Sequence, residues 1–325
     1  MDIPLKILKI DVPLDRRLVC ISDIHGELDL FKELLEYVRF CDDDILVLLG
    51  DYYSKGSKPD ETLDFVMELS TKSNVYCLRG NADAGAIEGI QTPGRLWVDT
   101  LPHIIESEHF LFTHAGLSSN NIHEQDVLTC MMSANFRDDY DGEPFEKWLI
   151  VGHWPVDNYC HKIPNHSPNV YREKKIISID GGIGMKSAGQ LNAFIIHNGK
   201  PSWRSVDKFD TMLSNTATAG SPGTVNVTYN NRFVEVVKSG EEFSRVLHLE
   251  SNIELDVPTN KIYTDREGKI CISDQATDHV LELRLGDIVK IVEEYSDRFY
   301  AKIDGEAGWV MARRDKQEAN DGVYI

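Results

Sequence analysis

Residues of the types that bind metal ions recur at intervals through the first half of the chain. They are Asp23, His25, Asp51, Asn81, His114 and His153. Carboxylate oxygens, imidazole nitrogens and an amide oxygen suit borderline divalent ions such as manganese, iron, zinc or cobalt. Six ligands are too many for one catalytic ion that keeps open positions, but they are about right for two ions sharing one carboxylate. Such a pair of ions can clamp a phosphoryl group for in-line displacement.

Alternating strands and helices are predicted to position these residues. Apolar runs and helical spacing predict a strand–helix–strand–helix–strand order over residues 17–22, 28–40, 45–49, 61–69 and 75–78. This order implies parallel strands joined by helical crossovers. Further strands are expected at 110–113, 149–151, 176–179 and 193–196, with the irregular spacing of a mixed or two-sheet sandwich. Because ligands lie outside the carboxyl ends of strands in open α/β sheets, we expect the six side chains to converge at one edge.

Five sequence blocks resemble those of the calcineurin-like metallophosphoesterases. They read DIHG, GDYYSKG, RGNAD, FTHAGLS and GHWPV, in the order expected for that family. The THAGL and GHWP forms are similar to the branch that holds Ser/Thr protein phosphatases and symmetrical diadenosine tetraphosphatase, and residues 178–182 and 189–191 resemble its closing block. The resemblance covers roughly residues 17 to 200. It implies an α/β fold, a four-layer α/β/β/α sandwich.

The resemblance also implies metal-binding roles. Asp23 and His25 would bind the first metal, and Asp51 would bridge both metals. A metal-bridging hydroxide would then attack phosphorus in line, and the amide of Asn81, a ligand of the second metal, would also contact the phosphate. The cofactors would be two divalent ions, manganese foremost, with iron, zinc, cobalt or nickel as alternatives. The second metal would be bound by Asn81, His114 and His153.

Two positions depart from the family pattern. Lys55 replaces a phosphate-binding arginine, and a lysine meets phosphate as a point charge without a bidentate fork. Ala82 replaces the histidine proposed to protonate the leaving group, whereas its usual partner Asp83 remains as a candidate catalytic residue. General acid catalysis is typically worth about 10²- to 10⁴-fold. We therefore expect weak turnover of alkyl phosphates such as phosphoserine and better turnover of activated leaving groups.

Two further residues are candidates for the site. Arg137, which precedes the fifth block, is a second candidate phosphate contact. Asp180 either orients a metal-bound histidine from outside the ligand set or is a turn residue before Gly181 and Gly182.

The chain is expected to contain two domains. Residues 1–208 form the predicted catalytic domain, and the polar residues 209–230 predict a linker or long loop. Short β-branched runs then predict an all-β region over residues 231–325. Within it, GDIVK and GEAGWV resemble bacterial SH3-like domains over about residues 255–314. That resemblance leaves a protein or peptide partner, a packing role and a dimerising role open.

Composition limits the partners. The chain has 53 acidic and 34 basic residues among 325, a formal net charge of -19 at pH 7. This argues against non-specific binding of nucleic acids or anionic membranes, which requires clustered basic residues. A phosphorylated substrate, either a phosphoprotein or a nucleotide, is still expected because metal ions supply local positive charge. The sequence shows no transmembrane run, no signal-peptide pattern and no close cysteine pairing, which predicts a cytoplasmic protein.

Three functions compete at this point. The leading one is a dinuclear-metal phosphomonoesterase similar to Ser/Thr protein phosphatases. The second is a hydrolase of nucleotide phosphoanhydrides of the Ap4A type, or of phosphodiesters, since an anhydride's phosphate leaving group needs no proton. The third is a degenerate metal-binding scaffold that recruits partners through the SH3-like tail. The intact ligand set argues against the third.

Overall fold

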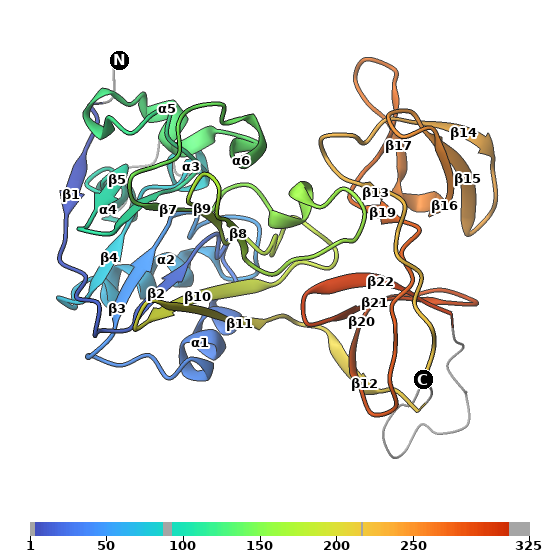
Figure 1. Ribbon diagram of the computed structural model, residues 1–325, viewed down its shortest axis with the longest axis horizontal. Coiled ribbons are helices and arrows are strands. Elements are labelled where there is room, and N and C mark those ends of the chain that lie inside the picture. The colour runs from blue at the N-terminus through green and yellow to red at the C-terminus, as the bar shows by residue number, and fades with distance from the viewer. Residues whose placement is uncertain (1–3, 87–92, 216, 312–325) are drawn as a thin grey trace. The chain divides into compact units, whose positions relative to one another are not determined.

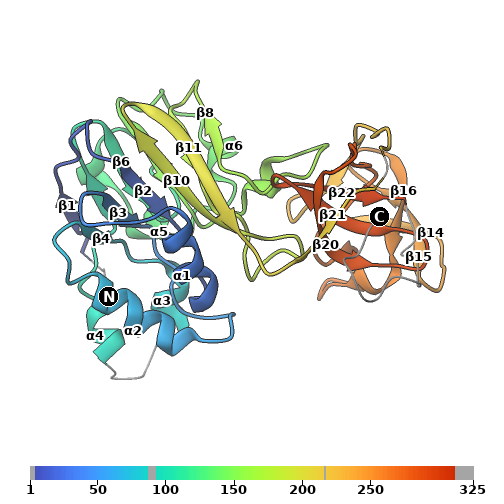
Figure 2. The same cartoon turned by 90° about the horizontal axis from the view of Figure 1, so that it is seen from below.

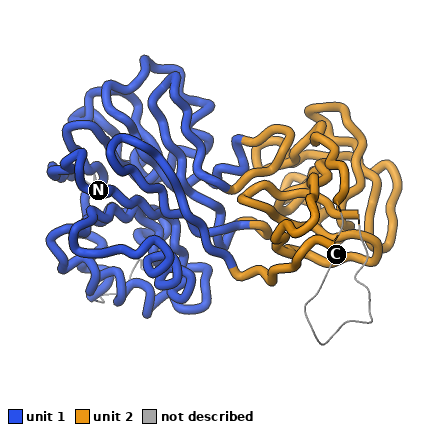
Figure 3. The backbone as a smooth tube through the Cα atoms, turned by 60° about the horizontal axis from the view of Figure 1, so that its bottom comes forward, with its two compact units in different colours: residues 1–159, 167–185, 189–207 blue, residues 160–166, 186–188, 208–325 orange. Residues whose placement is uncertain are grey.

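The computed structural model describes residues 4–86, 93–215 and 217–311, which divide into two compact units (Figure 3). The first unit comprises residues 1–159, 167–185 and 189–207. The second unit takes the two short intervening segments, 160–166 and 186–188, together with residues 208–325. Each unit has its own strands and its own hydrophobic clusters, so each is described by itself.

The first sheet of the first unit contains the predicted parallel core. Four of its strands run in the same direction, three of them paired in parallel with one another, and the fifth pairs antiparallel with the neighbours on its two sides. The crossovers are α1 (Leu28–Tyr37) and α2 (Pro59–Leu69), which confirms the predicted strand–helix order. Helix α2 begins with a proline and two acidic residues, which are residue types that favour a helix N-terminus. In order across the sheet, the strands are β11 (Lys200–Val206), β10 (Leu191–His197), β2 (Leu18–Ile21), β3 (Ile45–Leu48) and β4 (Val75–Cys77).

A six-stranded mixed sheet faces the first one. Its strands, in order, are β1 (Ile7–Lys9), β5 (Ile104–Glu106), β6 (Phe110–Thr113), β7 (Trp148–Val151), β9 (Ile176–Ser178) and β8 (Asn169–Tyr171). Short helices lie between the strands of the first unit: α3 (Asn81–Ala86), α4 (Pro93–Val98), α5 (Val127–Met132) and α6 (Phe136–Asp139). Single 3-10 turns span Ile122–Glu124 and Val156–Tyr159.

Three hydrophobic clusters define the layers of this unit (Figures 1 and 2). One lies between the two sheets and contains Val47, Phe112 and Phe194. A second packs α1, α2 and α4 against the five-stranded sheet, and a third packs α5 and α6 against the six-stranded sheet. Because the central strands are covered on both faces, their sequences are continuously apolar. The first unit is therefore the expected four-layer α/β/β/α sandwich.

The described part of the second unit consists of short strands. They form a four-stranded sheet, a three-stranded sheet and two strand pairs. These strands are β12 (Asp210–Leu213), β13 (Asn226–Val227), β14 (Val234–Lys238), β15 (Phe243–His248), β16 (Ile253–Pro258), β17 (Ile262–Thr264), β18 (Ile270–Ile272), β19 (Ala276–Thr277), β20 (Ile288–Glu294), β21 (Phe299–Ile303) and β22 (Glu306–Val310). A 3-10 turn spans Thr259–Lys261. The SH3-like identity of residues 255–314 stays a prediction.

The segment 209–230, predicted as a linker or long loop, differs from that expectation. Strand β12 pairs with β20 and buries Met212, and β13 pairs with β19 and buries Val227. The polar composition of this segment hid isolated apolar residues that pack into the clusters of the second unit. Among the described helices, none has the length and apolar character needed to cross a membrane.

Candidate active site

The six predicted ligand residues follow the carboxyl ends of strands in both sheets of the first unit (Figure 1). Backbone hydrogen bonds join these ends within each sheet, from Asp23 N to Gly50 O (3.1 Å) and from Gly152 N to His114 O (2.8 Å). Between the sheets, the His153 N–H donates to Asp23 Oδ2 at 2.9 Å. The loops after β2, β3, β6 and β7 are thereby tied together at one edge of the sandwich.

The loops reach this arrangement through unusual backbone conformations. Asp23, His25, Asp51 and His153 all have positive φ angles, of 56°, 49°, 58° and 65°. Such angles cost a non-glycine residue about 1–3 kcal/mol and concentrate at functional sites. Gly152 allows the close approach, because a Cβ atom there would overlap Ser22 Oγ and Asp23 Oδ2.

The ligand side chains form two groups that share one carboxylate. Asp23, His25 and Asp51 make one group, and Asp51, His114 and His153 make the other, with the ligand atoms of each group within 4.8 Å of one another. His25 Nε2 lies 3.8 Å from Asp23 Oδ1 and 3.9 Å from Asp51 Oδ2, while His114 Nε2 lies 3.5 Å from Asp51 Oδ1. The two oxygens of Asp51 thus face different histidines, as a carboxylate that bridges two cations would.

Hydrogen bonds outside the two groups orient the ligands. His114 Nδ1 lies 2.8 Å from Leu49 O, so this nitrogen donates and Nε2 is left to bind a metal. The Ser22 hydroxyl donates to Asp23 Oδ2. Sequence reasoning missed Ser22, and the only signal was a hydroxyl residue between a buried strand and a candidate ligand.

Asn81 gives a direct test of whether the residues fit a cation. Its amide oxygen lies 2.9 Å from His114 Nε2. Hydrogen bonding alone would favour the reversed amide, whose nitrogen would donate to His114 Nε2 and His153 Nδ1, both at 2.9 Å. A cation among these three groups requires the oxygen to face inward, because only the oxygen has a lone pair to share. Asp23 Oδ1 is also buried without a hydrogen-bond partner in the described structure. The donor set therefore fits divalent cations.

Protonation of the histidines is consistent with this fit. Burial lowers the pKa of His25, and burial with the charge of His114 lowers the pKa of His153 to about 4, so both rings are neutral near pH 7. Burial by itself would lower the pKa of His114, but the Asp51 carboxylate, the charge of Asp23 and the Leu49 carbonyl together raise it to about 10. Binding a metal at His114 requires the neutral ring and would release this proton.

Comparison with known proteins places this geometry in a family. The family model of the calcineurin-like phosphoesterases matches residues 16–176. That range contains all six candidate ligands and every strand end that carries them. The chain carries a calcineurin-like metallophosphoesterase domain. The family depends on dinuclear metal centres, in agreement with the two acidic and histidine groups that share Asp51.

Individual relatives are more distant. A symmetrical bis(5'-nucleosyl)-tetraphosphatase from Actinobacillus succinogenes is 31% identical, over 30% of this chain and 43% of the relative. The chain therefore spans less than half the length of this curated relative. Among solved structures, a candidate diadenosine tetraphosphatase is 20% identical, with a TM-score of 0.49 over 63% of this chain and 99% of that one. A serine/threonine phosphatase from Saccharomyces cerevisiae is 11% identical, with a TM-score of 0.42 over 63% and 83%.

Asp83 of this metallophosphoesterase domain is completely buried. Its Oδ2 accepts hydrogen bonds from Asp51 N (2.8 Å) and Gly80 N (3.2 Å), and its Oδ1 accepts from Tyr52 N (2.8 Å) and Tyr53 N (3.0 Å). Burial, with the charge of Asp51, raises the pKa of the Asp83 carboxyl to about 7. These contacts indicate that Asp83 holds the Asp51 loop in place, and its role as a catalytic residue stays a prediction.

Lys55 lies beside the ligand groups. Its Nζ is 3.4 Å from His25 Nε2 and also contacts Met185 Sδ. The residue is exposed and has a φ of 62°. An ammonium group at this position can approach a phosphate held by the metals, although the backbone strain shows only that the loop is tightly constrained.

Arg137 and Asp180 are less directly connected to the ligands. Each guanidinium nitrogen of Arg137 already has a partner: Nε donates to Asp138, Nη1 to Asn169 and Nη2 to Tyr159 O. A phosphate would have to displace some of these contacts. Asp180 is buried and accepts from Gly182 N at 2.7 Å, and burial with the charge of Asp23 raises its pKa. Within the described residues no hydrogen bond joins Asp180 to a ligand histidine, so its orienting role stays a prediction.

Proposed function

We propose that the chain is a metal-dependent phosphoric ester hydrolase with two divalent ions bridged by Asp51. The observation that carries this proposal is the membership of Asp51 in both ligand groups, with its two oxygens directed at different histidines. A site for one structural ion would need only one of these groups. The strained loops and the buried unpaired Asp23 Oδ1 add support, since both represent a cost that bound cations would offset.

The residues of the chain have separable tasks in this proposal. When bound, the metal ions supply positive charge for the phosphoryl oxygens and lower the pKa of water. Asp23 and His25 hold one ion, and Asn81, His114 and His153 hold the other. The Leu49 carbonyl keeps His114 in the tautomer that presents Nε2. Lys55 contributes an exposed cation at the edge of the site, and Asn81 also contacts the phosphate.

The leaving group decides which phosphorylated substrate this site handles best. Ala82 occupies the first turn of α3 beside Asn81 and has no group that can donate a proton from its side chain. Asp83 next to it is committed to four backbone N–H groups. Alkyl phosphates therefore lack assistance when the bond to the leaving oxygen breaks. We propose that monoesters with activated leaving groups and phosphoanhydrides are hydrolysed faster than phosphoserine.

A nucleotide phosphoanhydride is the second specific candidate, beside the phosphomonoester. It is favoured by Ala82, because an anhydride leaves as a phosphate that needs no proton. The relative that matches 30% of this chain is named as a symmetrical bis(5'-nucleosyl)-tetraphosphatase, which supports the same class.

A paired hydrolysis assay with manganese tests the function. The substrates are p-nitrophenyl phosphate, bis-p-nitrophenyl phosphate, a phosphoserine peptide and Ap4A, and an Asp51→Asn variant serves as the blank. We expect metal-dependent activity that falls at least about 10³-fold in the variant, as for loss of a group central to catalysis. Asp64→Asn, on the exposed face of α2, removes the same charge away from the site and should leave activity unchanged.

Each outcome assigns a function. Preference for Ap4A would support the anhydride, and preference for p-nitrophenyl phosphate would support the monoesterase. Preference for the diester would support the phosphodiesterase alternative. Absence of activity on all four substrates, with two metals measured in the protein, would contradict the hydrolase and favour the metal-binding scaffold.

A further inference from the structure

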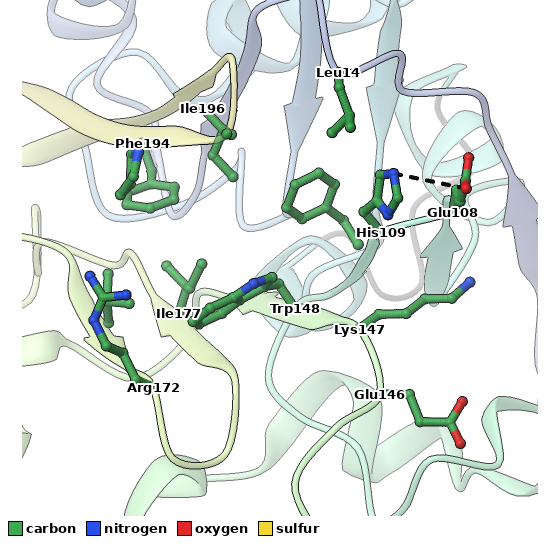
Figure 4. Close-up of a pocket in the computed structure, with 14 residues that line it drawn as sticks. Leu14, Glu108, His109, Glu146, Lys147, Trp148, Arg172, Ile177, Phe194 and Ile196 are labelled. Carbon is green, nitrogen blue, oxygen red and sulfur yellow. Dashed lines mark ion pairs between the residues drawn. The ribbon is translucent and has the colours of Figure 1, made fainter.

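A hollow of about 370 Å³ opens at one end of the sandwich in the first unit (Figure 4). Its walls come from both sheets: Phe110 and Trp148 lie on the six-stranded sheet, and Phe194 and Ile196 lie on the five-stranded sheet. The hollow thus opens onto the hydrophobic cluster that lies between the sheets. A cavity of this size matches the lower range of pockets that bind small molecules.

This hollow lies away from the candidate metal centre. Phe110 and Trp148 are the first residues of β6 and β7, whereas His114 and His153 follow the last residues of these strands. From Trp148 to His153 the chain advances five residues, which corresponds to roughly 16 Å along an extended strand. A molecule bound here would therefore not contact the metal ligands.

The lining combines flat rings with one unpaired cation. Figure 4 shows Trp148 in the middle of the hollow and Phe194 across from it, with Arg172 at one margin. The Arg172 side chain is exposed, and no hydrogen bond or ion pair holds its guanidinium among the residues that the structure describes. At the other margin, Lys147 is neutralised by Glu106 at 2.8 Å, and the carboxylate of Glu108 lies 3.9 Å from His109.

We propose that this hollow is a second ligand site, which binds a small aromatic carboxylate. The aromatic ring would stack against Trp148 and bury apolar surface against Phe194 and Ile196, since aromatic pairs gain from such contact. The carboxylate would accept two hydrogen bonds from the guanidinium of Arg172, whose planar fork matches the two carboxylate oxygens. The exposed carboxylates of Glu108 and Glu146 at the opposite margin repel an anion and so fix the orientation of the ligand.

Isothermal titration of the full chain with 2-naphthoate tests this site independently of any hydrolytic activity. We expect saturable binding of one molecule per chain, and 2-naphthalenemethanol and 2-naphthylmethylamine should bind more weakly. The Arg172→Gln variant should bind 2-naphthoate about tenfold more weakly, as expected for loss of a charge-assisted hydrogen bond. Arg266→Gln is the matched control, since it removes an exposed arginine of the second unit. It should leave the affinity unchanged.

A second variant and a competing anion check where 2-naphthoate binds. Leu14 lines the hollow and is 54% exposed, so Leu14→Glu should fold and should weaken binding by adding a negative charge to an apolar wall. Saturating inorganic phosphate should not compete, because it would bind at the metal centre. The proposal is overturned by absent binding at millimolar 2-naphthoate, by equal binding of the neutral or cationic analogue, by an unchanged affinity in Arg172→Gln, or by competition with phosphate.

Discussion

Ala82 is the residue at which the chemistry of this site departs most from that expected of its family. A histidine at this position would stand beside Asn81 and Asp83 and could protonate a leaving group. We predict that Ala82→His accelerates hydrolysis of a phosphoserine peptide by at least about tenfold. General acid catalysis in a site evolved for it typically contributes about 10²-fold or more. Hydrolysis of Ap4A should change little, because its leaving group needs no proton.

The control for this prediction is Ala82→Gln, which adds a side chain of similar size that cannot act as an acid near pH 7. Steady-state rates on both substrates, with metal content measured for each variant, separate the effect of proton donation from the effect of a larger side chain. Equal effects of His and Gln, or strong acceleration of Ap4A cleavage by His, would contradict the leaving-group argument.

Asp83 carries a different prediction at the same scale. An Asp83→Asn change would turn an NH₂ group toward backbone N–H groups that now donate to the carboxylate. We expect the free energy of unfolding to fall by about 2 kcal/mol, the cost of leaving buried polar groups unpaired. Manganese affinity should fall as well, since the Asp51 backbone is one of the donors. Urea unfolding and metal titration measure the two effects, and unchanged values for both would show that Asp83 does not position this loop.

Among the elements, the ends of β2 and β7 bring the two sheets together through Gly152. A Cβ atom at Gly152 would overlap Ser22 Oγ and Asp23 Oδ2 and would break the hydrogen bond from His153 N to Asp23. We predict that Gly152→Ala lowers the free energy of unfolding by about 2 kcal/mol, as overpacking of a tight site does. It should also reduce manganese binding. Gly85→Ala is the control, because a Cβ atom there meets nothing within 4 Å.

Chemical unfolding and metal titration of both glycine variants provide the measurement. Because alanine has the higher helix propensity, Gly85→Ala within α3 should be neutral or stabilising. A Gly152→Ala protein with normal stability and metal affinity would mean that the two strand ends are not coupled in this way.

The elements also show which parts of the fold the sequence can predict. The runs at β2, β3 and β6 are apolar on both faces, so they indicated strands and placed the candidate ligands at their ends. By contrast, β11 is mostly exposed and polar, and β12 buries a single methionine in a stretch rich in threonine and serine. Such edge strands exist because they pair with β10 and β20, and β20 lies far along the chain from β12.

The same limit applies to the site. The six ligand types and their spacing predicted a cluster. Five of the side chains form the two groups that share Asp51, and Asn81 lies beside His114. The sequence could not show that Asp83 accepts four backbone N–H groups or that Arg137 is held by Tyr159 and Asn169. Those facts depend on loop conformation, including positive φ angles at residues that rarely adopt them.

At the scale of the whole molecule, the negative net charge of the chain repels the negative charge of a phosphorylated substrate. A formal charge of -19 disfavours approach of any phosphorylated compound. Two divalent ions at the strand ends would reverse this locally, with Lys55 adding to their field. The charge of the chain as a whole therefore argues that affinity for phosphate depends on the metals.

Two short segments, 160–166 and 186–188, belong to the second unit although the chain returns to the first unit after each of them. In the second unit, Asn226 Nδ2 donates to Cys160 O (2.7 Å), Ala307 N donates to Pro164 O (3.0 Å) and Lys302 Nζ donates to Ala188 O (3.0 Å). A chain that ends after residue 207 retains segments 160–166 and 186–188 but loses all of these partners.

We predict that this shortened chain unfolds at a temperature about 10 °C lower than the full chain. Three lost hydrogen bonds at about 1 kcal/mol each account for such a shift in a unit of this size. Because segment 160–166 follows His153 and segment 186–188 follows Asp180, manganese affinity should fall in parallel. Differential scanning calorimetry and metal titration provide the test, and Asn226→Leu in the full chain should reproduce part of the shift. A shortened chain with the thermal stability and metal affinity of the full chain would show that the first unit holds its site without these contacts.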